Sequence, residues 1–434
     1  MPKATEVFTP TDVPTYTYVE RSTRDFEADL RNAFSIPKMI VSISGPSKSG
    51  KTVLVTKAVA PENLIHIYGA TIRDARDLWK NVIAWMGGPI ERTRTEGSRL
   101  AGDIGTTLGG KAGIPLLAEG KVDIKGTVSA DTSTSTAEKH DPTSLEAVAK
   151  EIAGSEYVVF IDDFHYIETA VREQIGKEIK AAAERGIRIC TASVPHRQDD
   201  VVRSNPELRG RVTAVDMSYW TEKELQEIGT KGFEKLNVTM PSGLIEALAA
   251  EAFGSPQLMQ TICLSLCFDR NIAESKFVSQ KIEQHPGLLK QTFERATATT
   301  DFSSLVATLH SGPKLRGTER KQFAFSDGTS GDVYRCVLLT MKADPSGLSF
   351  TYDQILRRSE QVCKDVSPAG SSVSLSLGHM ADLAKTVQQA QVLDWDENVL
   401  DIVEPYFIFY LRNSDQLARL APKSAAQTSL NLKS

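Results

Sequence analysis

The sequence predicts an α/β fold with a core built on a parallel sheet, followed by a helical domain and a C-terminal winged helix-turn-helix domain. Short apolar runs alternate with amphipathic helical stretches along the first half of the chain, which is typical of strand–helix–strand units. The second half is helical by its periodicity until two short apolar segments near its end. At 434 residues the chain has room for about two to four structural units.

The composition is that of an ordinary folded protein. Hydrophobic residues make up 41% and charged residues 24%, which excludes global disorder. The net charge of −5 provides no general positive field that would attract nucleic acid or an anionic membrane. The five cysteines are scattered and do not have the spacing of a disulfide framework. The first residues contain no apolar run typical of a signal peptide, and no apolar run in the chain approaches the roughly 20 residues of a membrane span. We therefore expect a cytoplasmic protein that does not contact membranes.

The parallel-sheet core is expected over residues 37–220, behind an N-terminal strap and helix at 1–36. Thr and Pro in the strap favour an extended chain, and a helix follows at 21–34. The predicted strands of the core are 39–44, 64–68, 157–162, 187–192 and 212–215, and the predicted helices are 51–60, 73–86, 144–153 and 168–185. The glycine-rich stretch 87–141 interrupts this alternation and is interpreted as an insertion with a hairpin at 121–128.

The remaining chain divides by periodicity and composition. Residues 221–297 are helical by pattern and form a predicted second domain, and the polar, irregular stretch 298–330 is interpreted as a linker. Three helices and a small hairpin over 331–413 are typical of a winged helix-turn-helix. The tail 414–434 is poor in aromatic residues and is expected to be flexible.

One motif in the core is highly specific. A phosphate loop that fits the pattern G-x-x-x-x-G-K-[ST] consists of Gly45, Pro46, Ser47, Lys48, Ser49, Gly50, Lys51 and Thr52. Backbone N–H groups of such a loop form a nest for anions, Lys51 can reach the β- and γ-phosphates, and the Thr52 hydroxyl can bind Mg²⁺. The loop follows a predicted strand and opens a predicted helix, as this mechanism requires. The sequence therefore predicts a P-loop ATPase core that binds ATP and Mg²⁺.

A second feature is the acidic end of the third predicted strand. The apolar run 157–161 is followed by Asp162 and Asp163. Two adjacent carboxylates at a strand end are costly unless a cation lies there, so Asp162 would hold Mg²⁺ and Asp163 would polarise the attacking water. The alternative is that these residues only cap the following helix. Asp163 stands where many ATPases have Glu, which makes ATP hydrolysis a weaker prediction than ATP binding.

With these motifs, the chain resembles the AAA+-like, STAND-type signalling ATPases of prokaryotes from about residue 16 to 412. The resemblance implies that residues 221–297 form a helical lid over the P-loop core. It also implies that the strand 189–193 ends in a γ-phosphate sensor, Ser193, and that Pro256 of the lid motif Gly254-Ser255-Pro256 contacts the base. The segment 404–412 is similar to the family's D-P-x-F-x-F-x-L-R motif, with Glu404 in place of Asp.

The resemblance also implies an arginine finger that reaches the γ-phosphate of a neighbouring subunit, and Arg209 and Arg211 are the candidates. A solvated loop arginine is the alternative for both. No Arg follows Pro256 directly, where ring-forming members place a second sensor, so a switch is favoured over a force-generating ring.

We expect an ATP- and Mg²⁺-binding switch that hydrolyses ATP and acts through self-assembly or an effector protein. The family resemblance alone suggests bacterial stress signalling or antiviral defence. One alternative is a DNA-associated AAA+ ATPase similar to transposition or loading regulators. The predicted recognition helix 374–388 carries Lys385 as its only strong cation, which does not favour nucleic acid as a partner. The other alternative is a nucleotide-locked scaffold that binds ATP without hydrolysing it.

Overall fold

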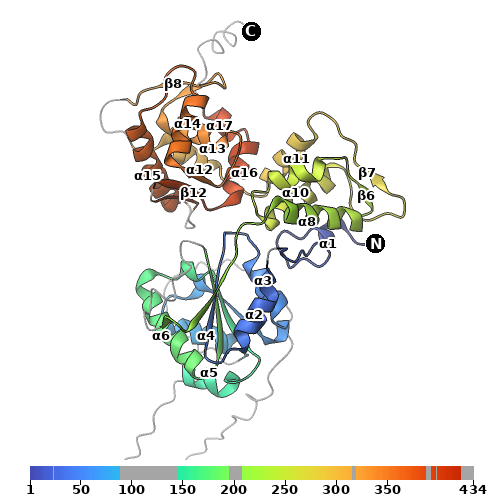
Figure 1. The fold of residues 1–434 in the computed structure, drawn as a ribbon, viewed down its shortest axis with the longest axis vertical. Coiled ribbons are helices and arrows are strands. Elements are labelled where there is room, and N and C mark those ends of the chain that lie inside the picture. Colours follow the sequence, from blue (N-terminus) through green and yellow to red (C-terminus); the bar gives the residue numbers. More distant parts are fainter. Residues whose placement is uncertain are drawn as a thin grey trace, which may run out of the picture. The chain divides into compact units, whose positions relative to one another are not determined.

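The chain forms two compact units (Figure 1). The computed structural model describes residues 1–22, 24–87, 144–194, 208–314, 319–387, 392–396 and 398–421. The sheet unit comprises Thr23–Gly45 and Lys51–Met217, and the helical unit comprises Met1–Ser22, Pro46–Gly50 and Ser218–Ser434. The predicted hairpin at 121–128, and nearly all of the insertion that contains it, lie outside the described residues.

The sheet unit contains five parallel strands in the order β2-β3-β4-β1-β5, which confirms the predicted α/β fold class. The strands are β1 Ile40–Ser44, β2 Leu64–Tyr68, β3 Val158–Asp162, β4 Arg188–Ser193 and β5 Val212–Asp216. They coincide with the five apolar runs that predicted strands. Every residue of β1 and β3 is buried, as expected for inner strands of a parallel sheet that is covered on both faces.

Helices cover both faces of this sheet (Figure 1). Helices α2 (Phe26–Ser35) and α3 (Lys51–Ala58) pack on one face through a cluster that includes Leu30, Val55 and Phe160. The opposite face is covered by α4 Ala75–Trp85, α5 Leu145–Ile152 and α6 Thr169–Glu184. Because all five strands are parallel, their carboxyl ends meet at a single edge, where ligands bind in open α/β sheets.

The N-terminal part of the helical unit is more regular than the sequence predicts. Residues 1–20 were expected to be extended, but α1 (Ala4–Val7) forms a short helix with its Ala4 and Val7 side chains buried. The predicted lid contains α8 Glu222–Lys235, α9 Leu244–Ala250, α10 Pro256–Asp269 and α11 Leu288–Thr297, with β6 Val238–Thr239 paired to β7 Gln280–Lys281.

The C-terminal part of the helical unit is mainly helical and shares one hydrophobic core with the lid helices. Its helices are α12 Ser303–Ser311, α13 Val333–Lys342, α14 Tyr352–Val362, α15 Gly370–Val387, α16 Pro405–Asn413 and α17 Gln416–Arg419. Its strands are β8 Phe323–Ala324, β9 Ser330–Gly331, β10 Ser349–Thr351, β11 Leu393–Asp396 and β12 Val399–Ile402, and β10, β12 and β11 form an antiparallel sheet. None of the described helices combines the length and apolarity that crossing a bilayer requires.

Two segments differ from the predicted irregular structure. Helix α12 lies within 298–330, where a linker was expected, because Leu305, Val306 and Leu309 bury one helical face in the core. Helix α17 lies within the tail 414–434 that was expected to be flexible. Its Leu417 is buried, and the carbonyl of Leu417 accepts a hydrogen bond of 2.8 Å from the buried Arg335 guanidinium.

Candidate functional site

The phosphate loop begins at the carboxyl edge of the sheet. The last residues of β1 and β4, Ser44 and Ser193, are register partners. The backbone N–H of Gly45 donates to the carbonyl of Ser193 over 3.2 Å, which fixes the first residue of the loop against the neighbouring strand. The predicted motif therefore occupies the strand-to-helix turn that leads from β1 into α3.

The conformation of the loop depends on residues in left-handed backbone conformations. Lys48 has φ 61° and Gly50 has φ 93°. Glycine adopts this region without strain, and its place before Lys51 allows the chain to turn into α3. Lys51 is buried at the first residue of α3, and its ammonium donates to the carbonyl of Gly45 over 2.8 Å. A buried cation beside a helix N-terminus is an arrangement that favours an anionic ligand.

Thr52 and Asp162, the two predicted magnesium ligands, lie in direct contact. The Thr52 hydroxyl donates to Oδ2 of Asp162 over 2.6 Å, and Oδ1 of the same carboxylate accepts the N–H of Asp163 over 3.0 Å. Hydroxyl and carboxylate oxygens are the ligands that Mg²⁺ prefers, and Mg²⁺ usually binds one or two such groups together with substrate phosphates. The donor set at this point of the sheet therefore fits Mg²⁺.

The charge of Asp162 is fixed by its neighbours. Burial by itself raises the pKa of this carboxyl, but hydrogen bonds from His66 and Thr52 and the charge of Lys51 outweigh burial and lower it. Asp162 is therefore ionised at neutral pH. The stability gained from this shift is present above the ordinary value of 3.8 and is lost when the pH falls through the lower value of the folded state.

Asp163 lies in a strained backbone conformation directly after β3. Its φ of 52° and ψ of 46° place it in the left-handed region, which non-glycine residues seldom occupy and which is often found at functional sites. A side chain at Gly69, in the turn after β2, would collide with the carbonyl oxygen of Asp163. Gly69 therefore provides the space in which Asp163 adopts this turn.

Ser193, the predicted sensor, has the properties expected of a ligand-binding hydroxyl. It is 4% exposed, and its Oγ has no hydrogen-bond partner among the described residues. A buried hydroxyl without a partner is costly, and a ligand or ordered water at the sheet edge would satisfy it.

Substitution of Ser193 by alanine tests this assignment. Removing a hydroxyl that contacts the transferred phosphoryl group should lower kcat for ATP about 10-fold or more and leave the Kd for ATP nearly unchanged. Phosphate-release kinetics and calorimetry on the same preparation measure both quantities. A variant with the wild-type kcat excludes Ser193 as a sensor.

The middle of the loop, Pro46–Gly50, groups with the helical unit and is held there by three hydrogen bonds. The Ser47 hydroxyl donates to Oε2 of Glu404 over 2.9 Å, and the Trp220 indole donates to the carbonyl of Ser49 over 2.9 Å. The Ser255 hydroxyl donates to the carbonyl of Lys48 over 3.4 Å. Within the helical unit, Pro46–Gly50 therefore contacts side chains from the start of the predicted lid, from the cap of α10 and from the cap of α16.

The predicted lid motif lies at the start of α10. Pro256 is the first residue of this helix, and Ser255 is its N-cap. Gly254 has φ 70°, and a Cβ atom there would come within 2.8 Å of the Cβ of Tyr219, so this position requires glycine. The carbonyl of Gly254 accepts the N–H of Trp220 over 3.1 Å. The motif thus fixes Trp220, which in turn contacts the loop.

The structure does not bring Arg209 and Arg211 to this site. Both are exposed and precede β5, and the carbonyl of Arg211 accepts the N–H of Ile40, the first residue of β1. They therefore lie at the amino edge of the sheet, opposite the carboxyl edge where Asp162 lies. Arg211 forms a 2.7 Å ion pair with Glu184. A role as an arginine finger stays a prediction for a neighbouring subunit.

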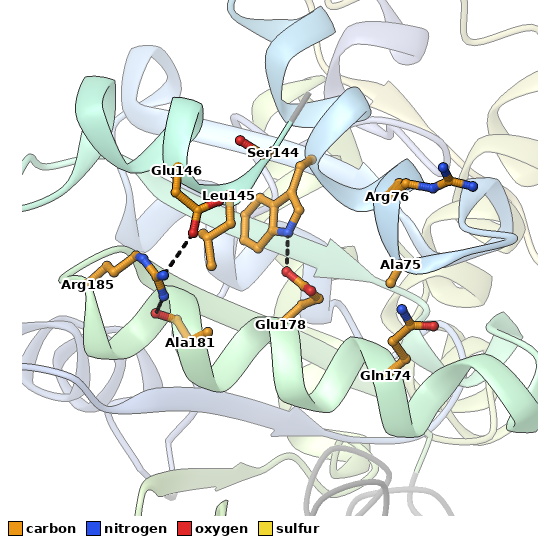
Figure 2. A pocket seen from close by; sticks show the side chains of 10 residues that line it. Ala75, Arg76, Ser144, Leu145, Glu146, Gln174, Glu178, Ala181 and Arg185 are labelled. Carbon is orange, nitrogen blue, oxygen red and sulfur yellow. Dashed lines mark hydrogen bonds and ion pairs between the residues drawn. The ribbon is translucent and has the colours of Figure 1, made fainter. Parts of the chain in front are cut away.

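A separate cleft of about 280 Å³ lies between α4, α5 and α6 (Figure 2). Its charged side chains are largely paired with one another or with nearby polar groups. Arg185 bonds to Glu146 over 2.9 Å, and the indole of Trp79 donates to Glu178 over 2.7 Å. None of the predicted site residues lines this cleft.

Comparison with known proteins finds similar solved structures at low sequence identity. No protein-family model matches the chain, and a search of curated proteins finds no match. The Aeropyrum pernix ORC2 protein in ADPNP–ADP complexes is 12% identical, with a TM-score of 0.47, and the match covers 95% of this chain and 98% of that chain. The Walker-type ATPase paby2304 of Pyrococcus abyssi is also 12% identical, with a TM-score of 0.47, and the match covers 91% of this chain and 98% of that chain. The Thermotoga maritima RuvB Holliday junction branch migration motor is 12% identical, with a TM-score of 0.40, and the match covers 91% of this chain and 97% of that chain. The assignment of the site rests on the residues of this chain.

Sequence reasoning missed several residues that the structure brings to the predicted ones. His66 on β2 contacts Asp162, Gly69 makes space for Asp163, and Trp220 contacts Ser49. A histidine inside the apolar run Leu64–Tyr68 was the one visible signal for the first contact. Asp162 could be recognised as the partner of this histidine only once the strand order was known, because β2 lies beside β3 in the sheet.

Proposed function

We propose that the protein binds ATP with Mg²⁺ in the phosphate loop and hydrolyses it. The observation that carries the proposal is the contact between Thr52 and Asp162, at 2.6 Å, beside a loop whose buried Lys51 opens α3. Two oxygen groups of the kind that Mg²⁺ prefers thus lie next to a helix N-terminus, a combination that would suit a magnesium–nucleotide complex. When bound, Mg²⁺ would neutralise charge that develops on the phosphates.

The residues of the sheet edge then have separate roles. Thr52 and Asp162 would hold the metal, and Lys51 would bind the β- and γ-phosphates. Asp163, held close to the metal carboxylate by its left-handed turn, would accept a proton from the attacking water. The Ser193 hydroxyl, which has no hydrogen-bond partner among the described residues, would contact the γ-phosphate.

We further propose that the protein is a switch, in which nucleotide and Glu404 compete for the phosphate loop. Oε1 of Glu404 caps α16 by accepting the N–H of Tyr406, and Oε2 accepts the Ser47 hydroxyl. A carboxylate therefore occupies a loop whose chemistry is to bind anions. ATP would displace it, and the population of states in which α16 is released from the loop would rise.

Substitution of Glu404 by glutamine tests this competition. The amide oxygen can still accept the Tyr406 N–H, and the amide NH₂ can donate to the Ser47 hydroxyl, which also accepts hydrogen bonds, while the charge that repels phosphates is lost. We expect ATP to bind about fivefold more tightly, because about 1 kcal/mol of unfavourable charge interaction is removed. Calorimetry with ATP and Mg²⁺ measures the change, and Glu360→Gln on the exposed face of α14 is the matched control. Equal affinities in wild type and Glu404→Gln would contradict the competition.

The proposed switch acts on a protein partner or on its own assembly, as in the STAND-type signalling ATPases that the motifs resemble. The helices α13, α14 and α15, followed by the β11–β12 hairpin, provide the elements of a winged helix, and we assign that role to residues 331–413. Measurement of the mass in solution with ADP and with ATP tests assembly. An unchanged mass would contradict self-assembly and leave action on an effector protein as the proposal.

A further inference from the structure

His66 lies close to the carboxylate that the proposed function assigns to Mg²⁺. It occupies the middle of β2, where its register partner on β3 is Phe160, two residues before Asp162. Alternate residues of a strand point to the same face of a sheet, so His66, Phe160 and Asp162 share the face that α3 covers. Nε2 of His66 lies 3.1 Å from Oδ2 of Asp162.

The direction of this hydrogen bond follows from the charge of the carboxylate. A carboxylate can only accept hydrogen bonds, whereas one ring nitrogen of a neutral imidazole carries a proton that it can donate. Nε2 of His66 therefore carries the proton and donates it. The Thr52 hydroxyl donates to the same oxygen, and the N–H of Asp163 donates to the other. Donors thus fix both oxygens of the carboxylate.

The imidazole is itself held in place by its neighbours. It stacks on the ring of Phe160, with ring centroids 5.0 Å apart and an interplanar angle of 28°. The centroid of the Tyr68 ring lies 4.5 Å from the centroid of the imidazole. The ring is about one quarter exposed. A donor on a rigid strand, clamped between two aromatic rings, has little freedom to point elsewhere.

We propose that His66 is a positioning residue for the magnesium site: its Nε2–H holds the Asp162 carboxylate in the orientation that binds the metal. This inference rests on the proposed function. Of the two donors to Oδ2, Thr52 is itself a proposed metal ligand, so His66 is the side chain whose hydrogen bond can persist when the metal is bound. Partners that orient a metal-binding carboxylate typically contribute about 10- to 100-fold to metal affinity.

Two substitutions separate this role from simple packing. His66→Phe keeps a flat ring between Phe160 and Tyr68 but removes the donor. His66→Gln loses the ring but places an amide N–H at the same number of bonds from Cβ as Nε2. A positioning role requires that glutamine function better than phenylalanine, whereas a packing role requires the reverse order.

The test measures ADP binding by calorimetry with and without Mg²⁺ for the wild type and both variants. We expect His66→Phe to weaken binding of ADP with Mg²⁺ about 10-fold or more and to leave binding of ADP without Mg²⁺ unchanged. His66→Gln should restore most of the metal-dependent affinity. Melting temperatures of the nucleotide-free proteins identify any variant that does not fold, and His66→Leu, which also removes the donor, replaces a phenylalanine variant that does not fold.

Three outcomes of this experiment would contradict the role of His66. Metal-dependent affinity that is equal in His66→Phe and wild type overturns the inference, and so does a phenylalanine variant that performs as well as the glutamine variant. Equal losses with and without Mg²⁺ also overturn it, because they show a general disturbance of the loop. A wild-type protein that binds no nucleotide removes the proposed function and this inference together, a result distinct from the other three.

Discussion

Replacement of Lys51 by alanine is expected to abolish the stabilisation of the protein by ATP and Mg²⁺. A ligand at about 100 times its Kd stabilises the folded state by about 2.7 kcal/mol, and this contribution disappears when binding is lost. Lys51 is buried, lies at the first residue of α3 and bonds to the carbonyl of Gly45, so its ammonium is already placed at the loop. Thermal unfolding with and without ATP and Mg²⁺ measures the effect.

Lys57→Ala is the matched control, because it removes a second lysine of α3 that is exposed in the last turn of the helix. The control should retain the full nucleotide-dependent shift. An equal shift in Lys51→Ala and wild type would show that nucleotide, if it binds, does so elsewhere.

Replacement of Asp162 by asparagine is expected to eliminate magnesium-dependent ATP hydrolysis while the protein remains folded. The metal contributes several kcal/mol to the stabilisation of transition-state charge, so kcat should fall by about 100-fold or more. The amide is nearly isosteric with the carboxylate and keeps an acceptor for Thr52. Binding of ADP without Mg²⁺ should persist.

The matched control for Asp162→Asn is Asp216→Asn. Asp216 ends β5 at the same carboxyl edge and is the register partner of Ser44, but it is exposed. Phosphate-release rates over a range of Mg²⁺ concentrations compare the two variants. If Asp162→Asn hydrolyses ATP with the wild-type dependence on Mg²⁺, the assignment of the metal site is wrong.

The strands of the sheet could be predicted because each is a short apolar run bounded by polar or glycine-containing turns. The order β2-β3-β4-β1-β5 could not be read from these runs, since the side-chain pattern of a strand does not specify which strands pair with it. Helix α12 was missed because its short apolar pattern lies within a stretch whose other residues are mostly polar. The burial of its apolar residues becomes clear only when the rest of the core is assembled.

The candidate site likewise contains some features that local sequence motifs predict and others that depend on contacts between distant parts of the chain. The phosphate loop and Asp162 are local motifs, and their contact through Thr52 follows from the general geometry of the loop. The bond between Ser47 and Glu404 joins residues 357 positions apart, and no local pattern specifies it. The bond between His66 and Asp162 depends on strand order, so it could be found only from the three-dimensional structure.

Isothermal titration calorimetry of the wild-type protein with ATP and Mg²⁺ tests the central claim most directly. We predict saturable heat for one nucleotide per chain, strongly reduced in Lys51→Ala and dependent on the metal in the wild type. No detectable heat on adding any purine nucleotide with a divalent cation to pure, folded protein would contradict the claim that residues 45–52 and Asp162 form a nucleotide site.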